Sequence, residues 1–229
     1  AIAEKFLEAR LGSTMMQHKV YAYISDGGVQ EEISQGAGRI AGLLKLNNLI
    51  MFYDANEIQL STECDVVMKE DTAKKYESWG WNVMEIPGND PDAIRAALVL
   101  AQKETERPTL IIGHTTMAKG ALKDDGSSYE RNVKTHGAPL GGDAYTNTVK
   151  HLGGDLENPF VIFDDVKELY AKRNAELREI VKARHAEEEE WRKQNPELAA
   201  KMDDWFSGSA PKVDWSALVQ KRDAATRAA

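Results

Sequence analysis

Short apolar runs that alternate with helix-length amphipathic segments constrain the fold of this chain more than any other feature. Four runs have the length and composition of buried strands, and polar turn residues bound them. They cover residues 20–24, 49–53, 81–86 and 109–113. Helices are predicted at residues 35–46, 71–79 and 92–104, the first within an amphipathic stretch that starts near residue 31. This alternation predicts an α/β fold in which helices flank a parallel sheet.

Polar residues follow the first two predicted strands where each strand ends. Ser25-Asp26-Gly27-Gly28 follows one strand, and Asn56 follows the next, thirty residues after Asp26. Each of these two segments alone is typical of a turn. The thirty residues between Asp26 and Asn56, however, are the separation that one strand-helix-strand unit requires. Open α/β sheets bind ligands at the carboxyl ends of their strands. Carboxylate and amide oxygens suit Mg²⁺, which usually binds together with phosphate, and the glycines let the backbone approach that phosphate at a helix N-terminus.

Composition excludes several other classes of protein. The net charge of −8, with no basic stripe, argues against binding of nucleic acid. No apolar run approaches the roughly 20 residues that span a bilayer, so no membrane interaction is predicted. The single cysteine, Cys64, excludes an internal disulfide framework and favours a cytoplasmic location, and it is expected to be a loop or core residue.

The second half of the chain has a different character. Residues 119–142 are rich in Gly, Ser, Asp and Asn, as long binding loops often are. Residues 166–191 are predicted to form one long charged helix, and Met202, Trp205 and Phe206 are expected to pack its return. The predicted organisation is a cofactor domain over 1–160, a helical extension over 161–210 and a linker over 211–229.

The motifs resemble those of a known family. Thiamine-diphosphate enzymes carry a Gly-Asp-Gly turn and, about thirty residues later, an Asn. Within that group, His136-Gly137-Ala138-Pro139-Leu140 is similar to an element of transketolases, and the similarity covers essentially the whole chain. The resemblance implies the thiamine-diphosphate-binding fold. It also implies thiamine diphosphate and Mg²⁺ as cofactors, with Ca²⁺ as a possible substitute for the metal ion.

The resemblance assigns roles to particular residues. The metal ligands would be the side chains of Asp26 and Asn56 and the backbone carbonyl of Ile58. The cofactor-binding residues would be Asp26, Gly27, Gly28, Asn56, His114 and His136, and the catalytic residues would be His136 and Glu31. Glu31 would join a network of carboxylates that links two active sites across a dimer, although an acidic residue also favours a helix N-terminus without any such role.

Three positions depart from the family pattern. Ser25 and Glu32 stand where transketolases have or often have Gly, and His114 stands where they commonly have Lys. A neutral imidazole neutralises phosphate less than a permanent cation does, so this departure concerns the affinity of the site for anions.

The resemblance also implies an activity for a longer protein. A transketolase transfers a two-carbon ketol unit between sugar phosphates in the pentose phosphate pathway, and it works as a homodimer. A first part of the diphosphate domain would precede Ala1, and a pyrimidine-binding domain would follow Ala229. The chain is therefore expected to be a half-site, inactive alone. Two alternatives stay open: the N-terminal subunit of a split transketolase, and a non-catalytic scaffold or binding domain that has lost its cofactor.

Overall fold

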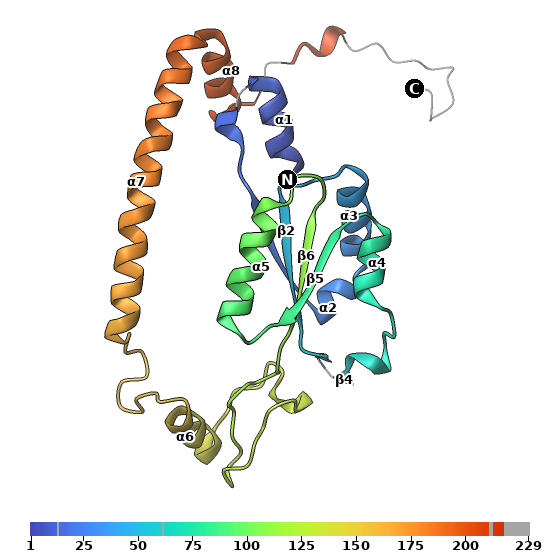
Figure 1. Ribbon diagram of the computed structural model, residues 1–229, viewed down its shortest axis with the longest axis vertical. Coiled ribbons are helices and arrows are strands. Elements are labelled where there is room, and N and C mark those ends of the chain that lie inside the picture. The colour runs from blue at the N-terminus through green and yellow to red at the C-terminus, as the bar shows by residue number, and fades with distance from the viewer. Residues whose placement is uncertain (13, 61, 211–212, 218–229) are drawn as a thin grey trace. The chain divides into compact units, whose positions relative to one another are not determined.

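Four parallel strands form the main sheet. The computed structural model describes residues 1–12, 14–60, 62–210 and 213–217. The strands lie in the order β1 (Val20–Ser25), β2 (Leu49–Ala55), β6 (Thr109–His114) and β5 (Asn82–Pro87), each parallel to its neighbour (Figure 1). The parallel sheet and its four strands are confirmed, with strand ends that differ from the prediction by one or two residues.

Helices cover both faces of this sheet. Helix α5 (Pro91–Lys103) lies on one face, and α3 (Glu32–Leu43) and α4 (Thr72–Ser78) lie on the other (Figure 1). Two buried clusters reflect this division. One contains Ile50 and Ile111 with alanines of α5, and the other contains Met51, Tyr53 and residues of α3 and α4. Because both faces are covered, the first five residues of β6 are all buried.

The helix boundaries follow local capping. Helix α5 has Pro at its first position, and the side chain of Asp90 accepts hydrogen bonds from two backbone N–H groups of its first turn. Helix α3 was predicted to reach residue 46 but ends at Leu43. It stops there because Lys45 adopts a positive φ of 50° and the N–H of Leu46 turns back to the carbonyl of Ala41.

Several short elements were not predicted. These are α2 (Asp26–Gln30), the antiparallel pair β3 (Ile58–Gln59) and β4 (Thr62–Glu63), helix α6 (Gly142–His151) and 3-10 turns such as η2 (Cys64–Val66) and η3 (Val133–Thr135). Except for the ten-residue α6, these elements have two to five residues and are too short to show a hydrophobic period. Helix α1 (Ile2–Leu11) precedes the first strand, and residues 119–141 are mostly irregular.

The chain divides into two compact units, Ala1–Arg173 and Asn174–Ala229, and the border falls within α7 (Asp164–Gln194). Helix α7 confirms the long helix predicted over residues 166–191, and α8 (Pro196–Phe206) follows it. Met202 is buried as predicted. Trp205 and Phe206, in the last turn of α8, are instead 44% and 63% exposed, so their predicted packing is wrong. Most of the predicted linker, residues 211–212 and 218–229, lies outside the described residues.

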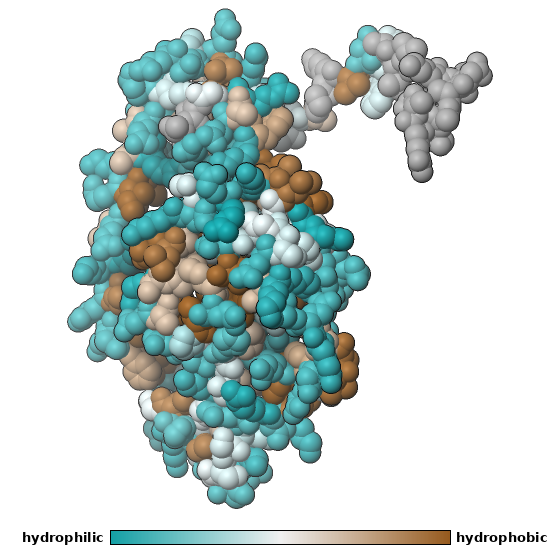
Figure 2. All heavy atoms as spheres, turned by 45° about the vertical axis from the view of Figure 1, so that its right-hand side comes forward, coloured by the Kyte–Doolittle hydropathy of each residue, from teal (hydrophilic) through white to brown (hydrophobic). Residues whose placement is uncertain are grey.

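Apolar side chains also reach the surface. Figure 2 shows apolar residues interrupting the hydrophilic surface on the face in view. On α3, Ile33 is 84% exposed and Leu43 is 80% exposed.

None of the helices within the described part of the chain is long and apolar enough to cross a membrane.

Candidate functional site

Asp26 lies at the carboxyl end of β1 and is the first residue of α2. Its side chain is buried, with the residue only 2% exposed. One carboxylate oxygen accepts a hydrogen bond of 2.6 Å from the Tyr53 hydroxyl. The other accepts from the backbone N–H groups of Asn56, at 3.0 Å, and Glu57, at 3.1 Å. A buried carboxylate requires donors of this kind, so the end of β1 and the segment after β2 are held together through Asp26.

The segment after β2 turns sharply at Glu57, which has a positive φ of 66°. The Oδ1 atom of Asn56 accepts a hydrogen bond of 3.0 Å from the N–H of Ile58, which stabilises the turn. Ile58 is 4% exposed and begins β3. The predicted adjacency of Asp26, Asn56 and Ile58 therefore appears in the structure.

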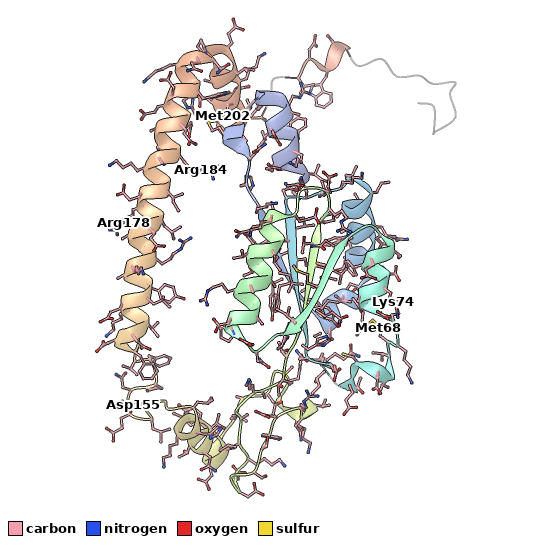
Figure 3. The ribbon with its side chains drawn as sticks, viewed as in Figure 1. Met68, Lys74, Asp155, Arg178, Arg184 and Met202 are labelled. Carbon is pink, nitrogen blue, oxygen red and sulfur yellow. The ribbon has the colours of Figure 1, made fainter. Side chains whose placement is uncertain are left out.

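These residues line a cavity of about 570 Å³ at the carboxyl edge of the sheet. Carboxylates dominate its charged lining, with Arg131 as the one lining cation among the described residues. Met68, another lining residue, is labelled in Figure 3. The charged residues that line the cavity are Asp26, Glu57, Glu63, Asp65, Glu70 and Arg131.

Tyr53 and Cys64 lie beside Asp26 on the cavity wall. Burial and the contact with Asp26 hold the pKa of the Tyr53 hydroxyl well above its usual value. Burial and the Asp26 carboxylate raise the pKa of the Cys64 thiol to about 12. Both groups are therefore protonated near neutral pH, and a thiol in this state is a poor nucleophile. This agrees with the expectation that Cys64 is a buried structural residue.

Gly27 and Gly28 lie within the first turn of the five-residue helix α2, not before a longer helix as the sequence suggested. A Cβ atom on Gly28 would lie 2.9 Å from Cγ1 of Ile24, whereas one on Gly27 would meet no atom within 4 Å. The backbone can therefore be approached closely at Gly27. Gly28 lets α2 pack against its own preceding strand.

Like Gly27 and Gly28, three other predicted site residues are not among those that line the cavity. Glu31 is exposed at the break between α2 and α3. His114, at the end of β6, is exposed, and its Nε2 lies 2.8 Å from a carboxylate oxygen of Glu85 on β5. His136 follows η3, and its Nδ1 is buried without a hydrogen-bond partner among the described residues.

A second group, missed in the sequence, lies on the opposite face of the same edge. The hydroxyls of Tyr23 and Thr115 both donate to Asp54, the first at 2.7 Å. These residues, with Phe52, line a second cavity of about 410 Å³. Successive side chains along β2 point to opposite faces of the sheet. Tyr53 and Asp54 therefore lie on different faces, although they are adjacent in sequence.

The donors around the first cavity suit a hard cation that brings further oxygen ligands with it. The described residues contain no group of three or more His, Cys, Asp or Glu side chains able to hold a metal ion by themselves. One buried carboxylate, one amide oxygen and a nearby backbone carbonyl form an incomplete oxygen set. Mg²⁺ typically binds through one or two carboxylates plus phosphate oxygens and water, so the residues fit a Mg²⁺-diphosphate group.

A family model described as "Transketolase, thiamine diphosphate binding domain" matches residues 1–211. The chain belongs to this family. Helices flank its parallel sheet as in the thiamine-diphosphate-binding fold of its structural neighbours, which are transketolases. The matched region of the transketolase family includes every residue that lines the first cavity.

Individual transketolases agree with this assignment. The chain is 34% identical to transketolase 2 of Escherichia coli over 228 residues, which is 96% of the chain but 32% of that protein. It is 38% identical to transketolase 1 of Vibrio cholerae over 170 residues, or 72% of the chain and 25% of the relative. The chain thus spans about a quarter to a third of these relatives.

Solved structures show the same relation. A transketolase mutant from Pichia stipitis, in complex with fructose 6-phosphate, superposes with a TM-score of 0.83 at 29% identity, covering 92% of this chain and 31% of that one. The transketolase of Campylobacter jejuni superposes with a TM-score of 0.70 at 34% identity, covering 87% and 30%.

Proposed function

We propose that this chain supplies the diphosphate and Mg²⁺ half-site of a transketolase, which transfers a two-carbon ketol unit between sugar phosphates. The observation that carries the proposal is the convergence of Asp26, Asn56 and Ile58 on one cavity at the carboxyl edge of a parallel sheet. By the resemblance to transketolases these positions would hold the metal ion, and Asp26 and Asn56 follow two adjacent parallel strands.

Each residue has a distinct task in this proposal. Asp26 and Asn56 bind Mg²⁺ through side-chain oxygens, and Ile58 binds it through its backbone carbonyl. The backbone at Gly27 and Gly28 receives the diphosphate, and His136 donates to it. His114 also donates to it in this proposal, once it has left Glu85. Bound thiamine diphosphate supplies the capacity to stabilise a carbanion, which side chains lack. The protein's contribution is to hold and orient the cofactor.

His136 is proposed to contact both the diphosphate and the donor sugar. Its buried Nδ1 has no partner among the described residues, as expected for a group whose partner is a ligand. Near neutral pH an imidazole can also move a proton.

We also propose that the longer protein is a homodimer. Glu31 is exposed directly before α3, whose apolar residues Ile33 and Leu43 are exposed as well. An exposed apolar helix face next to a carboxylate is suited to burial against a second subunit.

We propose the same domain organisation that the sequence suggested. The cofactor domain covers residues 1–160, the helical extension covers 161–210, and a linker to a pyrimidine-binding domain covers 211–229.

Calorimetric titration of the full-length protein with Mg²⁺ and thiamine diphosphate tests the proposal. Asp26→Asn should weaken Mg²⁺-dependent cofactor binding by about 100-fold or more, because the loss of even an outer-shell partner costs about 10- to 100-fold. Asp90→Asn is the matched control. The side chain of Asp90 also accepts hydrogen bonds from two backbone N–H groups, but Asp90 lines neither the first nor the second cavity. Equal binding by the Asp26 variant and the wild type would contradict the assignment.

Two further measurements separate the alternatives. The isolated chain should show no ketol transfer from xylulose 5-phosphate, and measurable transfer would contradict the half-site proposal. The contact between His114 and Glu85 favours one alternative, a scaffold domain without cofactor, because it occupies a proposed phosphate donor. A well-folded full-length protein that releases no heat with Mg²⁺ and thiamine diphosphate would support that alternative instead.

A further inference from the structure

The cavity that holds Asp26 has an unfavourable electrostatic character for an anionic ligand. Five of its lining residues are carboxylates: Asp26, Glu57, Glu63, Asp65 and Glu70. A diphosphate that enters this cavity meets repulsion that one divalent cation offsets only in part. Recognition of a phosphate group normally adds a positively charged side chain to such a site.

His114 and two lysines near this edge, Lys74 and Lys75, are paired with carboxylates. His114 lies against Glu85 on the edge strand. Lys74 pairs with Asp71 at 2.7 Å, and Lys75 pairs with Glu70. None of these three residues is among those that line the cavity.

Arg131 does line the cavity, and its backbone position is well defined. Its φ is +55°, a left-handed conformation that is uncommon outside glycine. Its N–H donates to the carbonyl of Met117 at 3.0 Å, and the preceding Tyr129 N–H donates to Ala121 at 2.8 Å. These bonds tie the loop that carries Arg131 to the segment that follows β6.

The guanidinium of Arg131 makes a loose ion pair that an incoming anion can replace. Its Nη1 lies 3.7 Å from Oε2 of Glu57, and the two side chains are 65% and 73% exposed. An exposed pair at this distance contributes little stability and is easily exchanged. The planar guanidinium presents several N–H donors that match phosphate oxygens in a bidentate arrangement.

We propose that Arg131 is a phosphate-binding residue of this cavity, contacting the diphosphate of the Mg²⁺-bound cofactor. The inference rests on the proposed function, because it takes Asp26, Asn56 and Ile58 as the metal site in the same cavity. It adds a cation from the long loop after β6, a segment separate from the two strand ends that supply the metal ligands.

The test compares four forms of the full-length protein: wild type, Arg131→Ala, Arg131→Lys and Glu57→Gln. Calorimetry measures the dissociation constants of Mg²⁺-thiamine diphosphate, Mg²⁺-pyrophosphate and Mg²⁺ alone. Arg131→Ala should weaken both diphosphate ligands by about 10- to 100-fold, the range expected when hydrogen bonds to a charged group are lost. Mg²⁺ alone should bind as tightly as before, or more tightly, because a cation has been removed from its surroundings.

The other variants separate phosphate binding from a structural role. Arg131→Lys should keep part of the affinity, since it retains the charge without the bidentate geometry. Glu57→Gln removes the partner of Arg131 and should leave the affinity unchanged or improved. If Arg131→Ala does not fold, the comparison of Arg131→Lys with Glu57→Gln carries the test. The expected result is then weaker diphosphate binding in the lysine variant only.

Three outcomes would overturn the inference. They are diphosphate affinities of the folded Arg131 variants within twofold of the wild type, equal weakening by Arg131→Ala and Glu57→Gln, and loss of Mg²⁺ affinity together with that of the diphosphates. Wild-type protein that binds no Mg²⁺-thiamine diphosphate would instead refute the proposed function, and the inference with it.

Discussion

Replacing Tyr53 by Phe tests how strongly the protein holds Asp26 in place. The substitution keeps the ring in the buried cluster and removes only the hydroxyl that donates to Asp26 at 2.6 Å. Hydrogen bonds to charged groups contribute about 1.5–3 kcal/mol, and a buried carboxylate that loses a donor keeps its desolvation cost. We therefore expect the free energy of unfolding to fall by about 1.5–3 kcal/mol.

Tyr76→Phe is the matched control for this substitution. Tyr76 belongs to the same buried cluster and is 1% exposed, but its hydroxyl has no hydrogen-bond partner among the described residues. Its ring contacts with Trp79 and Trp81, at 4.8 Å and 5.2 Å between centroids, do not need the hydroxyl. Removing an unpartnered polar group should leave stability unchanged or raise it by about 1 kcal/mol.

The assay is urea unfolding of the 229-residue chain at neutral pH, followed by tryptophan fluorescence. With slopes of about 1–3 kcal/mol per molar urea, the Tyr53 variant should unfold at a midpoint about 0.5–3 M lower. Both tyrosines have a raised pKa in the folded chain. They are therefore protonated in both states at this pH, and titration does not disturb the comparison. Equal midpoints for the two variants would refute the reasoning, because they would show that the bond to Asp26 contributes nothing measurable.

Two further predictions concern packing and pH. Gly42→Ala should destabilise the chain by about 1–3 kcal/mol, because the new Cβ would lie 1.8 Å from the carbonyl oxygen of Trp79. Gly36→Ala on the same helix meets nothing within 4 Å and should stabilise it by about 0.5–1 kcal/mol; the opposite order in thermal unfolding would contradict this. Partial burial and the hydrogen bond to Asp54 raise the pKa of Tyr23 to about 12. Its stabilising contribution is therefore complete below pH 10 and lost as the pH rises toward 12. Ultraviolet titration should show that Asp54→Asn lowers this pKa, and an unchanged titration would count against the contact.

Some helix and turn details were outside the reach of the sequence. Helix α2 contains two glycines in five residues, and the β3–β4 pair has two residues a side, so neither shows a period. Helix α3 ended before its apolar pattern did, since the chain turns back at Lys45. Trp205 and Phe206 are apolar but exposed, because hydrophobic character alone does not say whether a neighbouring surface covers a side chain.

The parallel sheet, its flanking helices and the meeting of Asp26 with Asn56 were predictable from sequence patterns, and the family resemblance added Ile58. Buried strands have a local pattern, and parallel strands bring their carboxyl ends to one edge. Which other groups reach that edge became clear from the folded chain alone. Tyr53 was adjacent to a predicted site residue, yet its role depends on which face it occupies. Arg131 lies far from Asn56 in sequence, and it lines the same cavity because the loop after β6 folds back. Contacts between distant segments leave no local pattern, since they depend on how the whole chain packs.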